Sequence, residues 1–132
     1  MRIIGLAGRA GAGKDSVANI LATDGTTSRV AFADPLRDGL IAMFGLSLGL
    51  DRHALTDPAR KERLFPELET TPRRLMQTLG TDWARKMIHP DVWVRVMDRR
   101  IKHHAMISRT LVITDVRFQN EAEWIYRKGG EV

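Results

Sequence analysis

A glycine-rich segment near the N-terminus constrains this chain more than any other feature. Residues 8–15 read Gly-Arg-Ala-Gly-Ala-Gly-Lys-Asp, which gives the spacing G-x-x-x-x-G-K. The segment follows a short apolar run, residues 2–7, and precedes a stretch with helical character, residues 15–23. Glycines let a backbone turn so that successive N–H groups point at phosphate oxygens. The spacing therefore predicts a strand, a phosphate-binding loop and a helix, in that order.

The predicted loop is suited to the phosphates of a nucleoside triphosphate. The helix that follows adds unpaired N–H groups and the positive end of its dipole. Lys14 is expected to reach the β- and γ-phosphates, which makes it a candidate catalytic residue. The alternative is a plain glycine-rich turn with an exposed lysine. The predicted ATP-binding residues are Gly8, Ala10, Gly11, Ala12, Gly13, Lys14, Asp15 and Ser16.

Position 15 departs from the usual pattern of such loops, in which a Ser or Thr hydroxyl ligates Mg²⁺. The Asp15 carboxylate can also serve a hard cation, directly or through water. Ser16 is one residue further along and is a second candidate for the same task. Both are therefore predicted metal ligands, with capping of the helix N-terminus by Asp15 as an equal alternative.

A second acidic residue follows the apolar run 111–114, which is predicted to be a buried strand. Ligands of open α/β sheets bind at the carboxyl ends of the strands. Asp115 is therefore a third predicted Mg²⁺ ligand, with a turn or capping role as the alternative. Arg117 is a second candidate catalytic residue, which would either neutralise transferring phosphate or pair with Glu121.

Apolar runs alternate with helical stretches along the chain, which implies a mostly parallel sheet covered on both faces. Asp34-Pro35 is expected to supply an N-cap and the first residue of a helix. Loops and short helical pieces are expected between residues 46 and 71. Strands are expected at residues 2–7, 29–33 and 111–114 and from Glu131 on, and helices at 15–23, 34–44, 71–87, 90–104 and 120–127.

Composition excludes several classes of protein. The 132 residues are 43% hydrophobic and 28% charged, as in an ordinary globular domain, and we expect a single domain over residues 1–132. No apolar run approaches the roughly 20 residues that span a bilayer. There is no cysteine for disulfides, thiolate metal sites or thiol nucleophiles. A cytoplasmic protein without a membrane partner is expected.

The formal net charge of +5 admits two explanations. A basic balance serves either a nucleic-acid surface or a cleft that collects small phosphorylated anions. The densest basic cluster, residues 95–104, is more typical of a solvated helix face. We therefore expect small-molecule nucleotide partners and regard nucleic acid as the less favoured partner.

The stretch 71–87 divides into two sides on a wheel of 100° per residue. One side is apolar and is predicted to be core: Leu75, Met76, Leu79, Trp83 and Met87. The other side mixes arginines with neutral hydrogen-bonding groups, which is unusual for a solvent face. We interpret it as a wall of an acceptor site, with arginines for a monophosphate and Gln77 and Thr81 for a base or sugar.

Several segments together resemble the phage-type deoxynucleoside monophosphate kinases, within the wider nucleoside monophosphate kinase-like P-loop group. The matching segments, in chain order, are IIGLAGRAGAGKDSVA (3–18), AFADPL (31–36), TPRRLMQTLGTDWAR (71–85), PDVWV (90–94) and TDVRFQNE (114–121). The Gly-Lys-Asp-Ser form of the loop is itself typical of that family. The resemblance implies a P-loop NTPase three-layer α/β/α fold, with a helical acceptor-site insertion over about residues 46–104.

The resemblance also implies an activity: transfer of the ATP γ-phosphoryl group to a deoxynucleoside 5′-monophosphate, with Mg²⁺. Asp115 and Arg117 would border the reacting phosphates. The family usually continues past Gly129-Gly130 with a further strand and an arginine-bearing lid, so we expect the fold to be C-terminally incomplete. The residues assigned to the acceptor are Asp34, Arg37, Arg73, Arg74, Gln77, Thr81 and Arg85.

Two other functions stay open at the level of sequence. One is a different small-molecule P-loop kinase, similar to dephospho-coenzyme A kinase. The other is a non-catalytic remnant that binds nucleotide or nucleic acid, which the basic cluster at 95–104 favours. A homodimer is compatible with either function and with the leading one.

Overall fold

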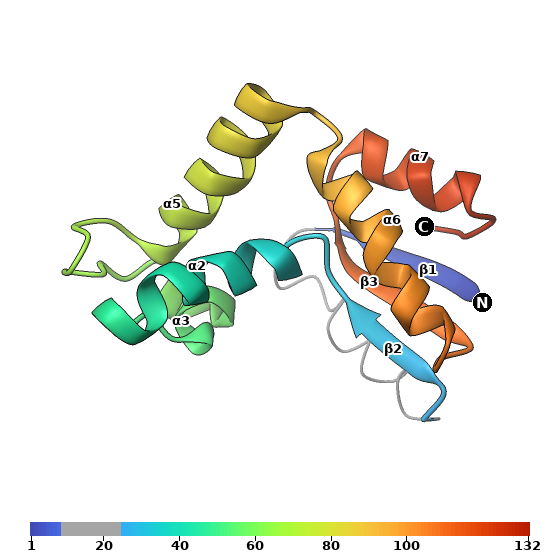
Figure 1. The fold of residues 1–132 in the computed structure, drawn as a ribbon, viewed down its shortest axis with the longest axis horizontal. Coiled ribbons are helices and arrows are strands. Elements are labelled where there is room, and N and C mark those ends of the chain that lie inside the picture. The colour runs from blue at the N-terminus through green and yellow to red at the C-terminus, as the bar shows by residue number, and fades with distance from the viewer. Residues whose placement is uncertain (9–24) are drawn as a thin grey trace. The chain divides into compact units, whose positions relative to one another are not determined.

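The computed structural model describes residues 1–8 and 25–132, and the chain is divided into two compact units. The sheet unit comprises Met1–Phe32 and Trp93–Val132, and the helical unit comprises Ala33–Val92 (Figure 1). Each unit is described by itself below. The predicted helix at 15–23 lies outside the described residues, and so do most of the predicted loop residues: Ala10, Gly11, Ala12, Gly13, Lys14, Asp15 and Ser16.

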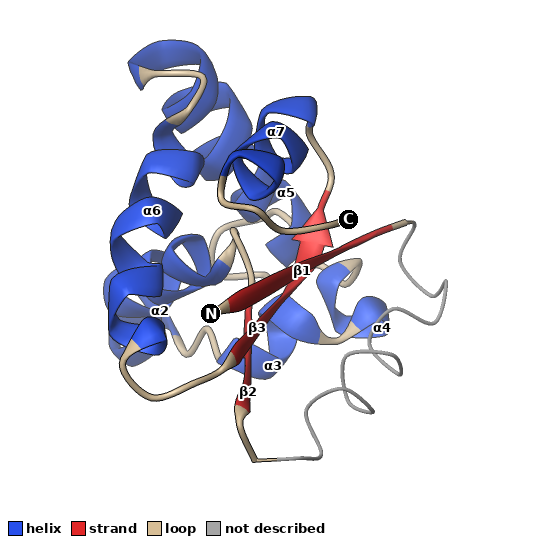
Figure 2. Cartoon of the chain, turned by 90° about the vertical axis from the view of Figure 1, so that its right-hand side faces the viewer, coloured by secondary structure: helices blue, strands red, loops and turns tan. Residues whose placement is uncertain are grey.

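Within its described residues, the sheet unit holds three parallel strands in the spatial order β1-β3-β2, which run side by side in Figure 2. Their bounds are Arg2–Ala7 for β1, Thr27–Val30 for β2 and Thr110–Val116 for β3. The middle strand, β3, pairs with both neighbours and has no exposed surface at Leu111, Val112 and Ile113. Continuous burial is what a central parallel strand requires, and it confirms the apolar run as a strand.

The second strand lies earlier in the chain than predicted, ending at Val30 and not at Ala33. The reason is a side chain that replaces a strand carbonyl: the backbone N–H of Phe32 donates to Oδ1 of Asp115 at 2.7 Å. Ala31 and Phe32 are buried, as their apolar character predicts, but they lie outside the regular pairing of β2 with β3.

The predicted start of a further strand at Glu131 is confirmed by a parallel bridge between Glu131 and Ile4. The N–H of Gly5 donates to the carbonyl of Glu131 at 2.7 Å, and the N–H of Glu131 donates to the carbonyl of Ile3 at 3.1 Å. Glu131 therefore lies along the edge of β1 that β3 leaves free. Gly129 turns the chain into this position with a φ of 79°.

Helices α6 (Val92–Ala105) and α7 (Gln119–Arg127) pack against one face of the sheet. The Trp124 ring of α7 meets the Phe32 ring edge-on, with centroids 5.9 Å apart. Its indole N–H donates to Asp98 of α6 at 2.9 Å, which ties the two helices together. The buried residues of this core are Ile3, Val30, Phe32, Val94, Met97, Ile101, Leu111, Ile113, Val116, Trp124 and Ile125.

The helical unit begins with α2 (Asp34–Leu48), where the predicted cap is wrong. Ala33 is already in the right-handed helical region and acts as the N-cap, so Asp34 is the first helical residue and Pro35 the second. The Asp34 carboxylate contacts the Arg37 guanidinium instead of capping the helix. The helix also runs four residues further than predicted, because Gly49 is the residue that adopts the left-handed conformation at its end.

Short helices follow, as predicted for the stretch between residues 46 and 71. Asp51, Asp57 and Thr71 each cap the helix that follows them by accepting a backbone N–H three residues on. Such caps satisfy donors that have no partner within the helix. The helices are α3 (Arg52–Thr56), α4 (Pro58–Lys61) and α5 (Pro72–Gln77), and the last continues directly into a wider helix, η2 (Thr78–Ile88).

The prediction of core residues is partly wrong in the wide helix η2. Its backbone bonds run from residue i to residue i+5, as from the His89 N–H to the Ala84 carbonyl at 3.0 Å. A wheel of 100° per residue therefore misplaces its side chains. Trp83 and Met87, predicted to be core, are 46% and 76% exposed, whereas Gly80 and Ala84 are buried. No helix among the described residues is long and apolar enough to cross a membrane.

Replacing Gly130 with Ala is expected to destabilise the sheet unit. A Cβ at this position would lie 2.6 Å from the backbone oxygen of Ile3, and backbone in a paired strand cannot yield as a flexible side chain can. We expect a loss of about 1–3 kcal/mol in the free energy of unfolding, measured by urea denaturation. Gly39→Ala in α2, where a Cβ meets nothing within 4 Å, is the control and should stabilise by up to about 1 kcal/mol. Equal effects of the two changes would contradict this account.

Acid should remove a stabilising contact between α6 and α7. The Lys128 ammonium and the Trp124 indole N–H both bond to the Asp98 carboxylate and lower its pKa below the usual value. A lowered folded-state pKa gives stability that is present above the unfolded pKa of about 3.9 and lost as the pH falls through the folded one. Asp98→Asn should therefore cost about 0.5 kcal/mol at pH 7 and less at pH 2.5. Denaturation curves at both values test this, and an equal cost at each would refute it.

Candidate functional site

The carboxyl ends of β1 and β3 bring two predicted site segments together. Ala7, the last residue of β1, is paired with Val116, the last residue of β3, after a shift in register beyond Gly5. Gly8 follows Ala7, and Arg117 follows Val116. The first residue of the predicted phosphate loop and the candidate catalytic arginine therefore leave adjacent strands at the same edge. Gly8 has a φ of 141°, a conformation that residues with side chains rarely adopt.

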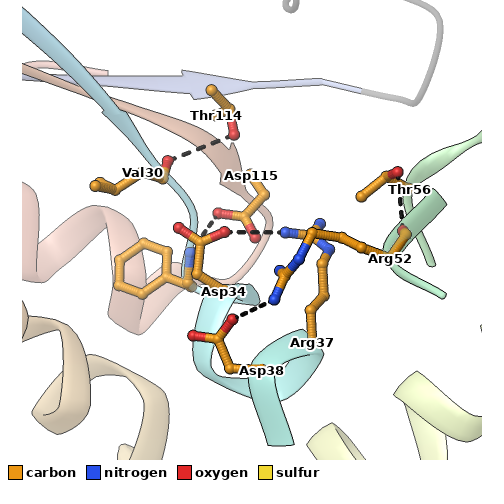
Figure 3. Close-up of polar contacts among 9 residues, drawn as sticks. Val30, Asp34, Arg37, Asp38, Arg52, Thr56, Thr114 and Asp115 are labelled. Carbon is orange, nitrogen blue, oxygen red and sulfur yellow. Dashed lines mark hydrogen bonds and ion pairs between the residues drawn. The ribbon is translucent and has the colours of Figure 1, made fainter. Parts of the chain in front are cut away.

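Asp115 lies within β3, one residue before its end, and not after the strand as predicted. Its side chain is half-buried, and Oδ1 accepts the Phe32 N–H (Figure 3). Thr114 reaches the same neighbouring segment through a long bond of 3.5 Å from its hydroxyl to the Val30 carbonyl. Asp115 thus supplies a side-chain acceptor where the backbone pairing of β2 with β3 ends.

The structure resolves how Arg117 and Glu121 are related. Oε1 of Glu121 accepts the backbone N–H of Arg117 at 2.9 Å and that of Phe118 at 3.0 Å. Glu121 is the third residue of α7 and is only 2% exposed. The predicted pairing of the two side chains is therefore replaced by bonds to backbone. Among the residues that the structure describes, no carboxylate forms an ion pair with the exposed Arg117 guanidinium.

The metal prediction rests on three residues, of which only Asp115 is described. No group of three or more His, Asp or Glu residues able to hold a metal occurs in residues 1–8 and 25–132. A single carboxylate nevertheless fits Mg²⁺, which keeps several waters and takes its other ligands from phosphates. With Oδ1 bonded to the Phe32 N–H, Asp115 is a fixed ligand candidate and not a freely rotating one.

Two predicted acceptor residues meet at the start of α2. Oδ1 of Asp34 lies 3.2 Å from a terminal nitrogen of Arg37, whose side chain is 17% exposed (Figure 3). The Nε of Arg37 is buried and has no hydrogen-bond partner within the described part of the chain. Asp34 belongs to the helical unit and Asp115 to the sheet unit, so their predicted convergence at one sheet edge stays a prediction.

The remaining acceptor candidates lie on α5 and η2. Arg85 donates to the Thr81 hydroxyl at 2.8 Å and to the Gly80 carbonyl at 3.4 Å, so these two predicted residues form one contact pair. Arg73 is held by an ion pair with Glu62, which follows α4. Arg74 and Gln77 are exposed, and the structure does not join them to the other candidates.

The sequence did not predict two ion pairs that involve or lie near the candidate residues. Glu62 pairs with Arg73, and an exposed pair joins Arg52 to Asp38 at 2.7 Å (Figure 3). These pairs link residues far apart in the chain, and no local signal reveals them. The sequence suggested Glu121 only as a side-chain partner of Arg117, and its bonds to backbone could have been found, because a Glu at the third helical position commonly bonds to the N-cap N–H. The Phe at the N-cap position hides that pattern, since it offers no side-chain acceptor.

The fold and this edge define the class of the protein. A parallel sheet whose first strand leads into G-x-x-x-x-G-K, with an aspartate near the end of the adjacent strand, is typical of P-loop kinases. The family described as "Deoxynucleotide monophosphate kinase" matches residues 61–132. The chain belongs to this family.

Two relatives carry related names. A protein of Acanthamoeba polyphaga mimivirus, named as a candidate deoxynucleotide monophosphate kinase, is 34% identical over 149 aligned residues, which cover 98% of this chain and 71% of that protein. The deoxynucleoside-5′-monophosphate kinase of Escherichia phage T5 is 35% identical over 63 residues, which cover 48% of this chain and 24% of the phage enzyme.

Asp115 should stabilise the fold even without a nucleotide. Asp115→Ala would leave the N–H of Phe32, a residue only 2% exposed, without its acceptor. An unsatisfied buried donor costs about 1–3 kcal/mol, so we expect a loss of this size in nucleotide-free denaturation curves. Asp115→Asn keeps an oxygen and should lose less. Thr114→Val, which removes only the 3.5 Å bond, is the control at about 0.5 kcal/mol or less. Wild-type stability of Asp115→Ala would contradict the structural role.

Proposed function

We propose that this chain transfers the γ-phosphoryl group of ATP to a deoxynucleoside 5′-monophosphate. The observation that carries the proposal is the pairing of Ala7 with Val116, because it sets the start of the phosphate loop beside Asp115 and Arg117. Family membership and the names of the two relatives support the choice of acceptor. A homodimer and a cytoplasmic location are secondary proposals that rest on the sequence alone.

The ATP side of the site would be formed by the predicted loop. Its backbone N–H groups and Lys14 would bind the β- and γ-phosphates, with Lys14 as a compact positive charge. Asp115, together with Asp15 and Ser16, would hold Mg²⁺, which when bound neutralises charge on the β- and γ-phosphate oxygens. The bond from Phe32 fixes the Asp115 carboxylate, so little ordering is needed when the site fills.

The acceptor side would be formed by residues of the helical unit. Arg37 supports this role, because its buried Nε is a donor that a phosphate oxygen could satisfy. Arg74 is exposed and has no ion pair among the described residues, so it too can meet a monophosphate. Arg73 would exchange or share its contact with Glu62. Asp34, Gln77, Thr81 and Arg85 would orient the sugar or the base.

The reaction would be an in-line displacement. An oxygen of the acceptor monophosphate forms a bond to the γ-phosphorus while the bond from that phosphorus to the β–γ bridging oxygen breaks. ADP then leaves with the electron pair of that bond. Lys14 and Arg117 would spread the negative charge that develops on the transferring group. The Arg117 guanidinium is available for this task, since Glu121 bonds to backbone and not to it.

An acceptor screen tests the proposal. The chain is incubated with ATP, Mg²⁺ and each deoxynucleoside monophosphate in turn, and ADP and the matching diphosphate are quantified together. We expect equal amounts of both products with at least one acceptor. Lys14→Ala should lower kcat/KM about 10²- to 10³-fold.

The matched control is Lys102→Ala, which removes an exposed lysine from α6 and should leave kcat/KM within about twofold. Folded wild-type protein that forms no diphosphate from any deoxynucleotide would refute the proposal. If dephospho-coenzyme A is phosphorylated and no deoxynucleoside monophosphate is, the other kinase function is favoured instead.

A further inference from the structure

We infer that Glu121 is a positioning residue, which sets the direction of Arg117 at the edge of the sheet through the backbone. The inference rests on the proposed function, in which Arg117 faces the transferring phosphoryl group. Glu121 would touch neither nucleotide. Its effect would pass through two peptide N–H groups in the turn between β3 and α7.

Two hydrogen bonds to Glu121 hold the backbone on both sides of the Arg117 Cα. One carboxylate oxygen of Glu121 accepts two consecutive N–H groups, those of Arg117 and Phe118, at 2.9 and 3.0 Å. Bonds to a carboxylate are stronger than bonds between neutral groups. Two such bonds fix the orientations of the two peptide planes that flank the Arg117 Cα, and therefore the direction in which its Cβ leaves the chain.

The Glu121 side chain is buried against the core. Glu121 is 2% exposed, although most glutamates on the first turn of a helix stay in water. A carboxyl group that only capped a helix could do so at the surface. Here the neighbours Trp124 and Ile125 on α7 are in the core, so the carboxylate is anchored by the same packing that fixes the helix to the sheet.

The strand register places the turn between β3 and α7 beside the end of β1. The turn begins immediately after Val116, which is paired with Ala7, so Arg117 and Gly8 leave adjacent strands at the same edge. A rotation of this turn would move the guanidinium relative to the sheet edge where Ala7 and Val116 are paired, without disturbing Asp115, whose carboxylate is held separately by the Phe32 N–H. Glu121 and Asp115 thus fix two different groups of the same site.

A double-mutant cycle with rescue tests the inference. Glu121→Ala removes the acceptor and should lower kcat about tenfold or more, with KM for ATP changed less than about twofold. Glu121→Gln keeps an oxygen in place and should restore most of kcat. In an Arg117→Met background, Glu121→Ala should change kcat less than about twofold, because the group it positions is gone. The fall in Tm should be equal in both backgrounds.

The control is Glu123→Gln on the same helix, an exposed glutamate that accepts from the Gln119 side chain at 3.0 Å; its kcat should match wild type. If Glu121→Ala does not fold, Glu121→Asp takes its place, since it withdraws the carboxylate by one methylene. An equal loss of kcat with and without Arg117, or no loss at all, overturns the inference and leaves Glu121 a structural residue only.

The same cycle is measured by calorimetric binding of ADP with Mg²⁺ and aluminium fluoride, which mimics a transferring phosphoryl group and needs no acceptor. We expect Glu121→Ala to weaken this binding about tenfold only when Arg117 is present. Wild-type binding of the mimic without phosphorylation of any deoxynucleotide would overturn the proposed acceptor but not the positioning role. Equal weakening in both backgrounds, or no binding by wild type, would overturn the positioning role.

Discussion

The parallel pairing of β3 with both of its neighbours is the constraint on which the sheet unit depends. Leu111, Val112 and Ile113 have no exposed surface, so their backbone groups must find partners within the sheet. β1 on one side and β2 on the other supply them. Because all three strands run in one direction, whatever follows β1 and β3 must leave the sheet at one edge. Burial of an apolar strand thus fixes where polar chemistry can occur.

Two carboxylates at that edge stabilise the fold by accepting hydrogen bonds from backbone N–H groups. Asp115 accepts from Phe32 and ends the pairing of β2, while Glu121 accepts from Arg117 and Phe118 and shapes the turn into α7. A site built in this way is ordered before any nucleotide arrives, which lowers the entropy lost on binding. If Asp115 also holds Mg²⁺ as proposed, loss of activity in an Asp115 variant would have two causes, a less stable fold and a missing ligand.

The elements whose signals are local lie where the sequence predicts them. The apolar run of β1, the buried run of β3 and the start of the helix at Thr71-Pro72 all lie where the pattern placed them. Predictions failed where a distant partner or a different helix period decides the outcome. β2 stops early because of the Asp115 side chain, 83 residues away from Phe32. Trp83 is exposed because η2 does not follow the period on which the wheel depends.

The site was predictable only where its signals are local. Spacing predicted the phosphate loop, most of which lies outside the described residues, and the aspartate of β3, but not the bonds by which Glu121 holds the turn. The wide helix η2 carries this lesson beyond one molecule. Its wide turns decide which side chains lie on one face, and they bring Arg85 within hydrogen-bonding distance of Thr81. A gap aligned between Thr78 and His89 would shift this pairing, so the proposed roles of Thr81 and Arg85 carry over only to a relative that keeps the same helix.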